Sequence, residues 1–311
     1  MRENLPFVSI IIPCRNEEKY VGKCVESVLN QTFPKEKMEI LVIDGMSTDK
    51  TREIVRRYSE VRILDNPKKI FPAANNIGIR NAKGEFLIIM GAHAVYSLDY
   101  VEKCIKHLMA NPDADNVGGI LRPSSAKDTI IAKAITLSLG GRFGKGREEK
   151  EKEKSGEEVD TVFGGCYRKE VFQKIGLFNE NLEGSSDMDL NLRLLRSGGK
   201  TLLVPGVVVY YYPKDNLKDF FFHNIRDGIW AILPFKFTKR TMKLRHYIPL
   251  VFVLSLPLSI WLYIPLTFYF SAKIALREKE IRYFFLMPIV FATRHIGYGL
   301  GSVWGLIKLI I

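Results

Sequence analysis

Residues 8–55 read VSIIIPCRNEEKYVGKCVESVLNQTFPKEKMEILVIDGMSTDKTREIV. Within this stretch, residues 8–12 form a nearly continuous β-branched run, which is typical of a strand buried on both faces. Residues 17–30 carry apolar side chains at helical spacing, and residues 40–43 and 49–58 repeat the strand and helix patterns. This alternation predicts an α/β fold, with a parallel sheet covered by helices on both faces.

The same alternation continues along the chain. Residues 61–64 predict a third strand, residues 73–82 a helix and residues 86–90 a fourth strand. Ligands of a doubly wound sheet bind beyond the carboxyl ends of its strands. We therefore expect the functional residues in the loops that follow the first, second and fourth strands.

The composition restricts the possible partners. Lys and Arg number 46 against 34 Asp and Glu, so the formal net charge is +12. Part of this excess lies in residues 236–245, directly before the apolar C-terminal region, where cations favour an anionic membrane surface at about 1 kcal/mol each. No base-reading motif accompanies the charge, so nucleic-acid binding is not expected. The cysteines lack metal-ligand and disulfide spacing, which predicts free thiols in a reducing compartment for Cys14, Cys24, Cys104 and Cys166.

The C-terminal region, residues 248–311, predicts a membrane anchor. Residues 248–272 carry no charge and are long enough to cross a bilayer, although three prolines leave a re-entrant hairpin open. Residues 283–311 form a second apolar run, with glycines that permit close helix packing. We expect two transmembrane helices, hence a multi-pass cell-membrane protein whose preceding domain is cytoplasmic. Arg294 either contacts a lipid phosphate or extends to the interface.

Residues 214–247 are predicted to connect this anchor to a first domain, residues 1–213. Residues 216–237 are amphipathic and rich in aromatic side chains. We therefore expect them to lie flat at the membrane interface, next to the basic residues.

A segment of low complexity divides the first domain. Residues 140–158 combine glycines with a mixed run of charges, so they cannot bury apolar surface and are expected to be mobile. They separate a first half, about residues 1–122, from a second half, residues 159–213. The segment is either a lid that orders over a bound ligand or a stretch without function.

Polar and glycine residues mark three further positions. Asp44, at the end of the second strand, either forms a turn or accepts hydrogen bonds from a nucleobase or ribose, and we favour the second role. Asp49 is interpreted as a helix N-cap. Gly164 and Gly165 either allow the backbone to approach a substrate or bend the chain.

The motifs together resemble those of the family 2 inverting glycosyltransferases. The resemblance begins with residues 8–55 and continues through residues 75–78, 82–85, 160–182 and 187–198. It is strongest to the succinoglycan-type branch, which carries Asp-Ala-His after its fourth strand. The resemblance implies a GT-A fold, a nucleotide-sugar donor and transfer of a hexose, from a donor of the GDP-mannose or UDP-glucose type.

The resemblance also assigns residues to the donor. It places Pro13, Arg15, Glu17 and Asp44 around the nucleoside. Arg80 is a weaker candidate for the diphosphate, and its alternative role is that of a solvated helix residue.

The loop after the fourth strand departs from the family pattern. The family usually carries Asp-x-Asp there and binds a divalent cation, whereas this chain has Gly91-Ala92-His93. His93 and two diphosphate oxygens could still hold Mn²⁺, which tolerates nitrogen better than Mg²⁺ does. His223 is a candidate second ligand. Alternatively, His93 hydrogen-bonds a phosphate or ribose and no metal binds.

The later motifs correspond to the acceptor side. Asp187 matches the family's catalytic aspartate and is our candidate general base, although Ser186 replaces the glutamate that usually precedes it. Asp189 either supports the start of the helix or orients the acceptor. Arg226, with Trp230 on the acceptor side, lies near the family's arginine/tryptophan region and contacts either the diphosphate or a lipid headgroup.

The sequence thus predicts a membrane-anchored glycosyltransferase that acts on a polyprenyl-linked saccharide. Two alternatives stay open. A polyprenyl-phosphate hexose synthase uses a phosphate nucleophile and needs no general base. A catalytically inactive scaffold in a glycan-assembly complex would account for the altered metal and Glu-Asp motifs.

Overall fold

The computed structural model describes residues 5–140, 143, 157–238 and 244–311. Most of the predicted mobile segment, residues 140–158, lies outside the described residues. Contacts divide the chain into two compact units. The sheet unit comprises Met1–Arg122 and Glu151–Tyr211, and the helical unit comprises Pro123–Lys150 and Tyr212–Ile311. The helical unit therefore includes a stretch that the sequence-based division assigned to the first domain.

The sheet unit is built on one mixed sheet. Within the described residues it has eight strands in the order β3-β2-β1-β4-β7-β6-β8-β5. The first four are parallel, as predicted, whereas β7 runs antiparallel to β4 and β6, and β5 runs antiparallel to β8. The bounds are β1 Val8–Cys14, β2 Met38–Asp44, β3 Val61–Asp65, β4 Phe86–Ile89, β5 Ala94–Tyr96, β6 Ala114–Pro123, β7 Phe163–Arg168 and β8 Lys200–Tyr211.

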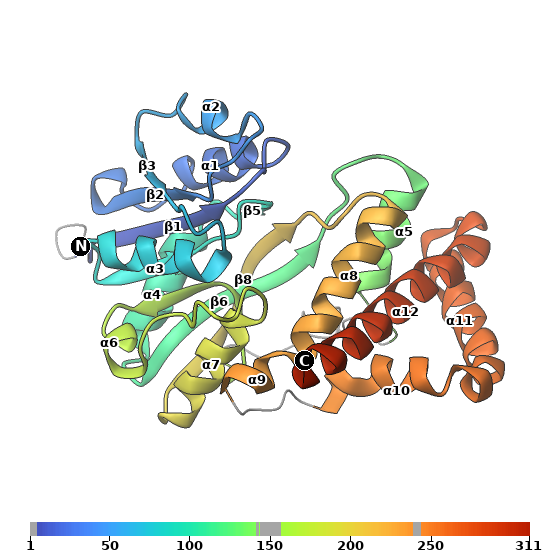
Figure 1. The fold of residues 1–311 in the computed structure, drawn as a ribbon. Helices are drawn as coiled ribbons and strands as arrows, with labels where there is room; N and C mark the ends of the chain where they lie inside the picture. The colour runs from blue at the N-terminus through green and yellow to red at the C-terminus, as the bar shows by residue number, and fades with distance from the viewer. Residues whose placement is uncertain (1–4, 141–142, 144–156, 239–243) are drawn as a thin grey trace. The chain divides into compact units, whose positions relative to one another are not determined.

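Helices cover both faces of this sheet, which explains the apolar run of β1. Every residue of β1 is buried, and its side chains alternate between two cores. Ile10 and Ile12 pack with α1, α2 and α4, whereas Ile11 packs with α3, α6 and α7 (Figure 1). The bounds are α1 Val21–Leu29, α2 Thr51–Val55, α3 Phe71–Asn81, α4 Tyr100–Ala110, α6 Val171–Ile175 and α7 Ser186–Arg196, with a short 3₁₀ turn at Lys35–Lys37.

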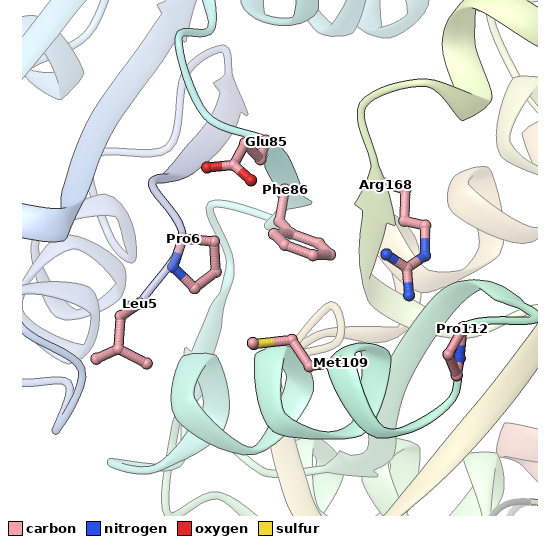
Figure 2. A pocket seen from close by; sticks show the side chains of 7 residues that line it. All are labelled: Leu5, Pro6, Glu85, Phe86, Met109, Pro112 and Arg168. Carbon is pink, nitrogen blue, oxygen red and sulfur yellow. The ribbon is translucent and has the colours of Figure 1, made fainter. Parts of the chain in front are cut away.

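A pocket of about 540 Å³ lies at the amino-terminal edge of the parallel strands (Figure 2). Leu5 and Pro6 precede β1, Phe86 begins β4, and the Arg168 guanidinium lies 5.5 Å from the centre of the Phe86 ring. Ligands of this fold class bind at the opposite edge. The candidate functional site is therefore elsewhere.

The helical unit is a bundle in which α12 contacts α5, α8, α10 and α11 (Figure 1). A Cβ added to Gly301 would lie 2.0 Å from the carbonyl oxygen of Ile225, and one added to Gly228 would lie 2.0 Å from that of Tyr298. The glycines thus permit close packing of α8 on α12, as predicted. The bounds are α5 Ile130–Leu139, α8 Leu217–Ile232, α9 Pro234–Thr238, α10 Ile248–Leu254, α11 Leu256–Glu278 and α12 Arg282–Ile310, with a 3₁₀ turn at Leu244–Tyr247.

In the part of the chain that the structure describes, one helix is long and apolar enough to cross a membrane. This helix is α11, and only 17% of its most apolar stretch is buried. The predicted span of residues 248–272 is divided at Ser255, where α10 ends and α11 begins. The prediction of two transmembrane helices and a multi-pass topology is not supported, because α11 is the one described helix whose length and hydropathy suit a membrane span.

Candidate active site

The loops after β1 and β2 interlock at the carboxyl edge of the sheet. The Asn16 backbone N–H donates to Ser47 Oγ (2.9 Å), and the Thr48 N–H donates to Asn16 Oδ1 (2.9 Å). Asn16 adopts φ +55°, a left-handed conformation that asparagine tolerates better than most residues. Asp49 accepts from the Glu18 N–H and from the Thr51 N–H at the start of α2. The two loops therefore form one braced rim.

Asp44 lies beneath this rim, and its side chain is 1% exposed. Ser47 Oγ donates to Asp44 Oδ1 (2.5 Å), and Arg52 Nη1 donates to Asp44 Oδ2 (3.0 Å) and to Asp65 Oδ1 (2.6 Å). Asp44 thus anchors the loop after β2. As the last residue of β2 it also lies at the carboxyl edge of the sheet. A carboxylate oxygen accepts more than one hydrogen bond, so acceptor capacity remains for a ligand.

Cys14 and Arg15 occupy opposite environments next to Asp44. Burial, followed by the charge of Asp44, raises the pKa of the Cys14 thiol, which therefore stays neutral. All four cysteines are free and buried, as predicted. Arg15 is exposed; its stem packs over Gly45, and its Nη1 donates to the Lys69 carbonyl at 3.5 Å.

His93 and Glu17 meet at this edge. His93 Nδ1 lies 3.1 Å from Glu17 Oε1, which joins the turn after β4 to the loop after Pro13. The adjacent Ala92 is buried and contributes backbone only. Across the described residues, no group of three or more His, Cys, Asp or Glu side chains could hold a metal. The pair offers one imidazole and one carboxylate. The diphosphate oxygens of a bound nucleotide-sugar would therefore have to complete a metal site.

Aromatic rings lie where the family carries its first carboxylate. A Cβ added to Gly91 would lie 2.9 Å from Phe163 Cζ. The Tyr211 ring makes edge contacts with the rings of Phe163 (6.0 Å between centres) and His93 (5.2 Å). The sequence analysis missed Phe163 and Tyr211. Their only signal was position, since Phe163 precedes the Gly164-Gly165 pair and Tyr211 lies close to the end of the predicted first domain.

Gly164 and Gly165 approach the protein itself. Gly164 has φ +67°, and a Cβ there would lie 2.6 Å from Tyr100 Oη. A Cβ on Gly165 would lie 2.8 Å from Asn116 Oδ1. Both glycines are buried. The close approach that these glycines allow in this structure is to internal side chains, and their place on the acceptor side stays a prediction.

Asp187 is exposed in the first turn of α7. β8 follows α7 and runs toward the carboxyl edge of the parallel strands, where its last residue, Tyr211, pairs with Ala94, next to His93. Because α7 runs in the opposite direction to β8, it starts at this same edge. Burial, followed by the charge of Asp187, raises the pKa of Tyr167. The Tyr167 hydroxyl donates to Asn191 Oδ1 (3.3 Å), one turn beyond Asp187.

Asp189 has a structural role. Its side chain is 7% exposed and accepts from Arg193 Nε at 2.8 Å. Arg193 also donates to the carbonyls of Ile175 and Leu177, which lie in the connection from α6 to α7. The observed contacts thus correspond to support of the helix start rather than to orientation of an acceptor.

The remaining predicted residues belong to other elements. Arg80 is exposed in the last turn of α3, which leads into the start of β4 and hence to the opposite edge of the sheet. This place does not suit a diphosphate contact. Arg226 and Trp230 lie on α8 of the helical unit, as does His223, whose Nε2 is 3.6 Å from Asp227.

Arg294 contacts the protein within the helical unit. Its Nη1 donates to the Ser138 carbonyl at 3.1 Å, at the C-terminal end of α5. Cations at this position satisfy carbonyl groups that a helix end leaves without partners. This nitrogen therefore caps the end of α5, and the contact of Arg294 with a lipid phosphate stays a prediction.

Comparison with known proteins identifies relatives along almost the whole chain. Residues 9–176 match the model of Glycosyl transferase family 2. The Methanococcus voltae protein "Dolichyl N-acetyl-alpha-D-glucosaminyl phosphate 3-beta-D-2,3-diacetamido-2,3-dideoxy-beta-D-glucuronosyltransferase" is 32% identical over 323 residues, which cover 97% of this chain and 98% of the relative. Succinoglycan biosynthesis protein ExoA of Rhizobium meliloti is 26% identical over 303 residues, covering 95% and 86%.

A solved structure shares the fold. The mannosyltransferase PcManGT from Pyrobaculum calidifontis, in complex with GDP-Man and Mn²⁺, superposes with a TM-score of 0.65 at 20% identity, covering 97% of this chain and 88% of that one. The predicted GT-A fold is thereby confirmed. Because the family match spans more than half of the 311 residues, this chain belongs to glycosyl transferase family 2 and is a nucleotide-sugar-dependent glycosyltransferase.

Proposed function

We propose that this enzyme transfers a hexose from a UDP- or GDP-sugar onto a lipid-linked saccharide, with inversion in a single displacement. One observation carries the proposal. The Methanococcus voltae relative, whose name states a dolichyl-phosphate-linked N-acetylglucosamine acceptor, matches the helical unit as well as the sheet unit. A shared helical unit supports a shared class of acceptor.

The braced loops after β1 and β2 support the donor assignment. Asp44 and the rim around Asn16 are held by the protein's own hydrogen bonds, so they require little reordering to receive a nucleoside. Glu17 and His93 lie next along the edge, where the diphosphate follows the nucleoside. Binding and slow hydrolysis measured across UDP- and GDP-sugars would name the donor. Binding of none of them would overturn the proposal.

Glu17 and His93 are the residues that would hold a divalent cation, and Mn²⁺ matches a nitrogen and an oxygen ligand better than Mg²⁺ does. When bound, such a cation neutralises the developing charge of the diphosphate leaving group. We expect exhaustive chelation to abolish turnover and added Mn²⁺ to restore it. Full turnover after chelation would exclude a role for the cation.

Asp187 is proposed as the general base. It is exposed at the edge that carries His93, and a carboxylate there can accept the proton of an attacking acceptor hydroxyl. A phosphate nucleophile already carries its charge and needs no such group. The role of Asp187 therefore separates transfer to a saccharide from transfer to a polyprenyl phosphate.

We expect Asp187→Asn to lower kcat by about 10²–10⁴-fold, because the acceptor hydroxyl loses its base. The Kd of the nucleotide-sugar, measured by calorimetry, should stay unchanged. Asp189→Asn is the matched control on the same helix, and it should lower the Tm through loss of the Arg193 contact. Wild-type turnover by Asp187→Asn would favour the polyprenyl-phosphate hexose synthase.

We also propose that α11 anchors the enzyme to the membrane, since this helix is long, apolar and largely exposed. Lys273 and Arg277 are the cations of its C-terminal part, where anionic headgroups would receive them. The acceptor lipid and the enzyme would then share one membrane surface.

A further inference from the structure

Gly91 is fixed in a place that admits no side chain. Its N–H donates to Tyr96 Oη at 2.7 Å, and its carbonyl accepts from Cys24 Sγ at 3.6 Å. Phe163 closes the remaining side, with Cζ 2.9 Å from an added Cβ. An aspartate at position 91, the first residue of the family's Asp-x-Asp motif, has no room while the Phe163 ring stays in place. The packing of Phe163 thus accounts for the absence of this carboxylate.

The backbone of Phe163 is also held. The Tyr100 hydroxyl donates to the Gly164 carbonyl at 2.7 Å and lies 3.1 Å from the Phe163 carbonyl. The left-handed conformation of Gly164 allows this close approach. The ring position of Phe163 is therefore set by a buried hydrogen bond and by its contact with Gly91.

Tyr211 extends the aromatic surface. As the last residue of β8 it pairs with Ala94, and its ring makes T-shaped contacts with the rings of Phe163 and His93. Phe163, Tyr211 and His93 are all half-buried. Together, Phe163 and Tyr211 form a partly exposed aromatic wall beside the residue assigned to the diphosphate.

The strand order predicts which part of a bound nucleotide-sugar lies next to this wall. The nucleoside loops follow β1 and β2, His93 follows β4, and β7, which begins with Phe163, lies on the far side of β4. A nucleotide-sugar that follows this order brings its hexose to β7. One face of a hexose ring carries C–H groups, and such a face stacks on the electron-rich face of an aromatic ring.

We propose that Phe163 and Tyr211 bind the hexose of the donor by stacking, in the place where other members of the family have a carboxylate. This inference rests on the proposed function. The wall selects sugars that present an apolar face beside the diphosphate. Recognition of the nucleotide itself belongs to the loops after β1 and β2.

The test compares a nucleotide-sugar with its nucleoside diphosphate. Phe163→Leu and Tyr211→Leu keep an apolar side chain but remove the ring, and Tyr211→Phe is the matched control that keeps it. We expect the leucine variants to bind the nucleotide-sugar about tenfold more weakly by calorimetry, with unchanged affinity for the nucleoside diphosphate. Tyr211→Phe should retain the affinity of the wild type for both.

The nucleoside diphosphate is also the internal control for folding of the site. The stacking proposal would be overturned if the leucine variants lost affinity equally for both ligands, or lost no affinity for the nucleotide-sugar. A loss of sugar affinity in Tyr211→Phe would overturn it as well, and would assign recognition to the hydroxyl. Failure of the proposed function has a different signature, because the wild type would then bind no nucleotide-sugar.

Discussion

Gly91 and Phe163 are coupled through a contact that leaves no space for a side chain between them. We predict that Gly91→Asp lowers the free energy of unfolding by about 1–3 kcal/mol, because the new atoms overpack the site. In the double variant with Phe163→Ala, the added carboxylate has room, and the two changes should be non-additive by about 0.5–3 kcal/mol. Thermal unfolding of the four proteins measures this coupling. Strict additivity would contradict it.

Residue types could be predicted from the sequence better than their contacts. Asp187 was chosen from its motif, and the structure places it exposed at the expected edge, while its role stays a prediction. Gly164 was left between an approach to substrate and a bend of the chain, and its contact with Tyr100, 64 residues earlier in the chain, was not predicted. For Asp189 the sequence left two roles open, support of the helix start and orientation of the acceptor, and its contact with Arg193 was not predicted. Such contacts depend on tertiary packing, which a local motif does not encode.

Among the elements, the stacked glycines of α12 make the most specific prediction. A Cβ on Gly301 would lie 2.0 Å from the Ile225 carbonyl oxygen, whereas one on Gly305 would lie 3.0 Å from that of Ile229. We expect Gly301→Ala to lower the Tm in detergent clearly more than Gly305→Ala, at a cost of about 1–3 kcal/mol. The two variants make the same substitution on the same face of one helix. Equal Tm values would mean that α8 and α12 pack less closely than described.

The first elements were predicted well because their signals are local. The strand predicted at residues 8–12 is β1, Val8–Cys14, and the helix predicted at residues 73–82 is α3, Phe71–Asn81. The second half of the sheet was not predicted, since β7 runs antiparallel to β4 and β6, β8 runs antiparallel to β5, and long connections join β6 to β7 and β7 to β8. Their pairing is set by distant partners such as Asn116 and Tyr167 rather than by periodicity.

For the whole molecule, the exposed surface of α11 decides where the enzyme resides. Leu258 and Leu262 are 83% and 75% exposed. We predict that Leu258→Glu with Leu262→Glu releases the protein from lipid vesicles, since an acidic residue in the bilayer costs about 2.5–3.5 kcal/mol. Leu98→Glu is the control, because Leu98 is also exposed but lies in the sheet unit. Retention of the double variant on vesicles would contradict anchoring by α11.

The membrane region was harder to predict from sequence than the sheet. The length of the apolar run favoured one span at residues 248–272, but the helix is interrupted at Ser255, between α10 and α11. The second apolar run forms α12, which buries its glycines against α8 and α10. Hydropathy counts the apolar residues of a helix and does not tell whether lipid or another helix covers them.

The helical unit is assembled from two separate stretches of the chain, residues 123–150 and 212–311. A gene shortened after β8 would still encode α5, whose buried Ala134 and Ile135 would lack their partner α12. One fusion at the end of an ancestral gene, or one stop codon, could therefore neither add nor remove this unit cleanly. The interleaved order implies that the sheet and the helices were inherited together.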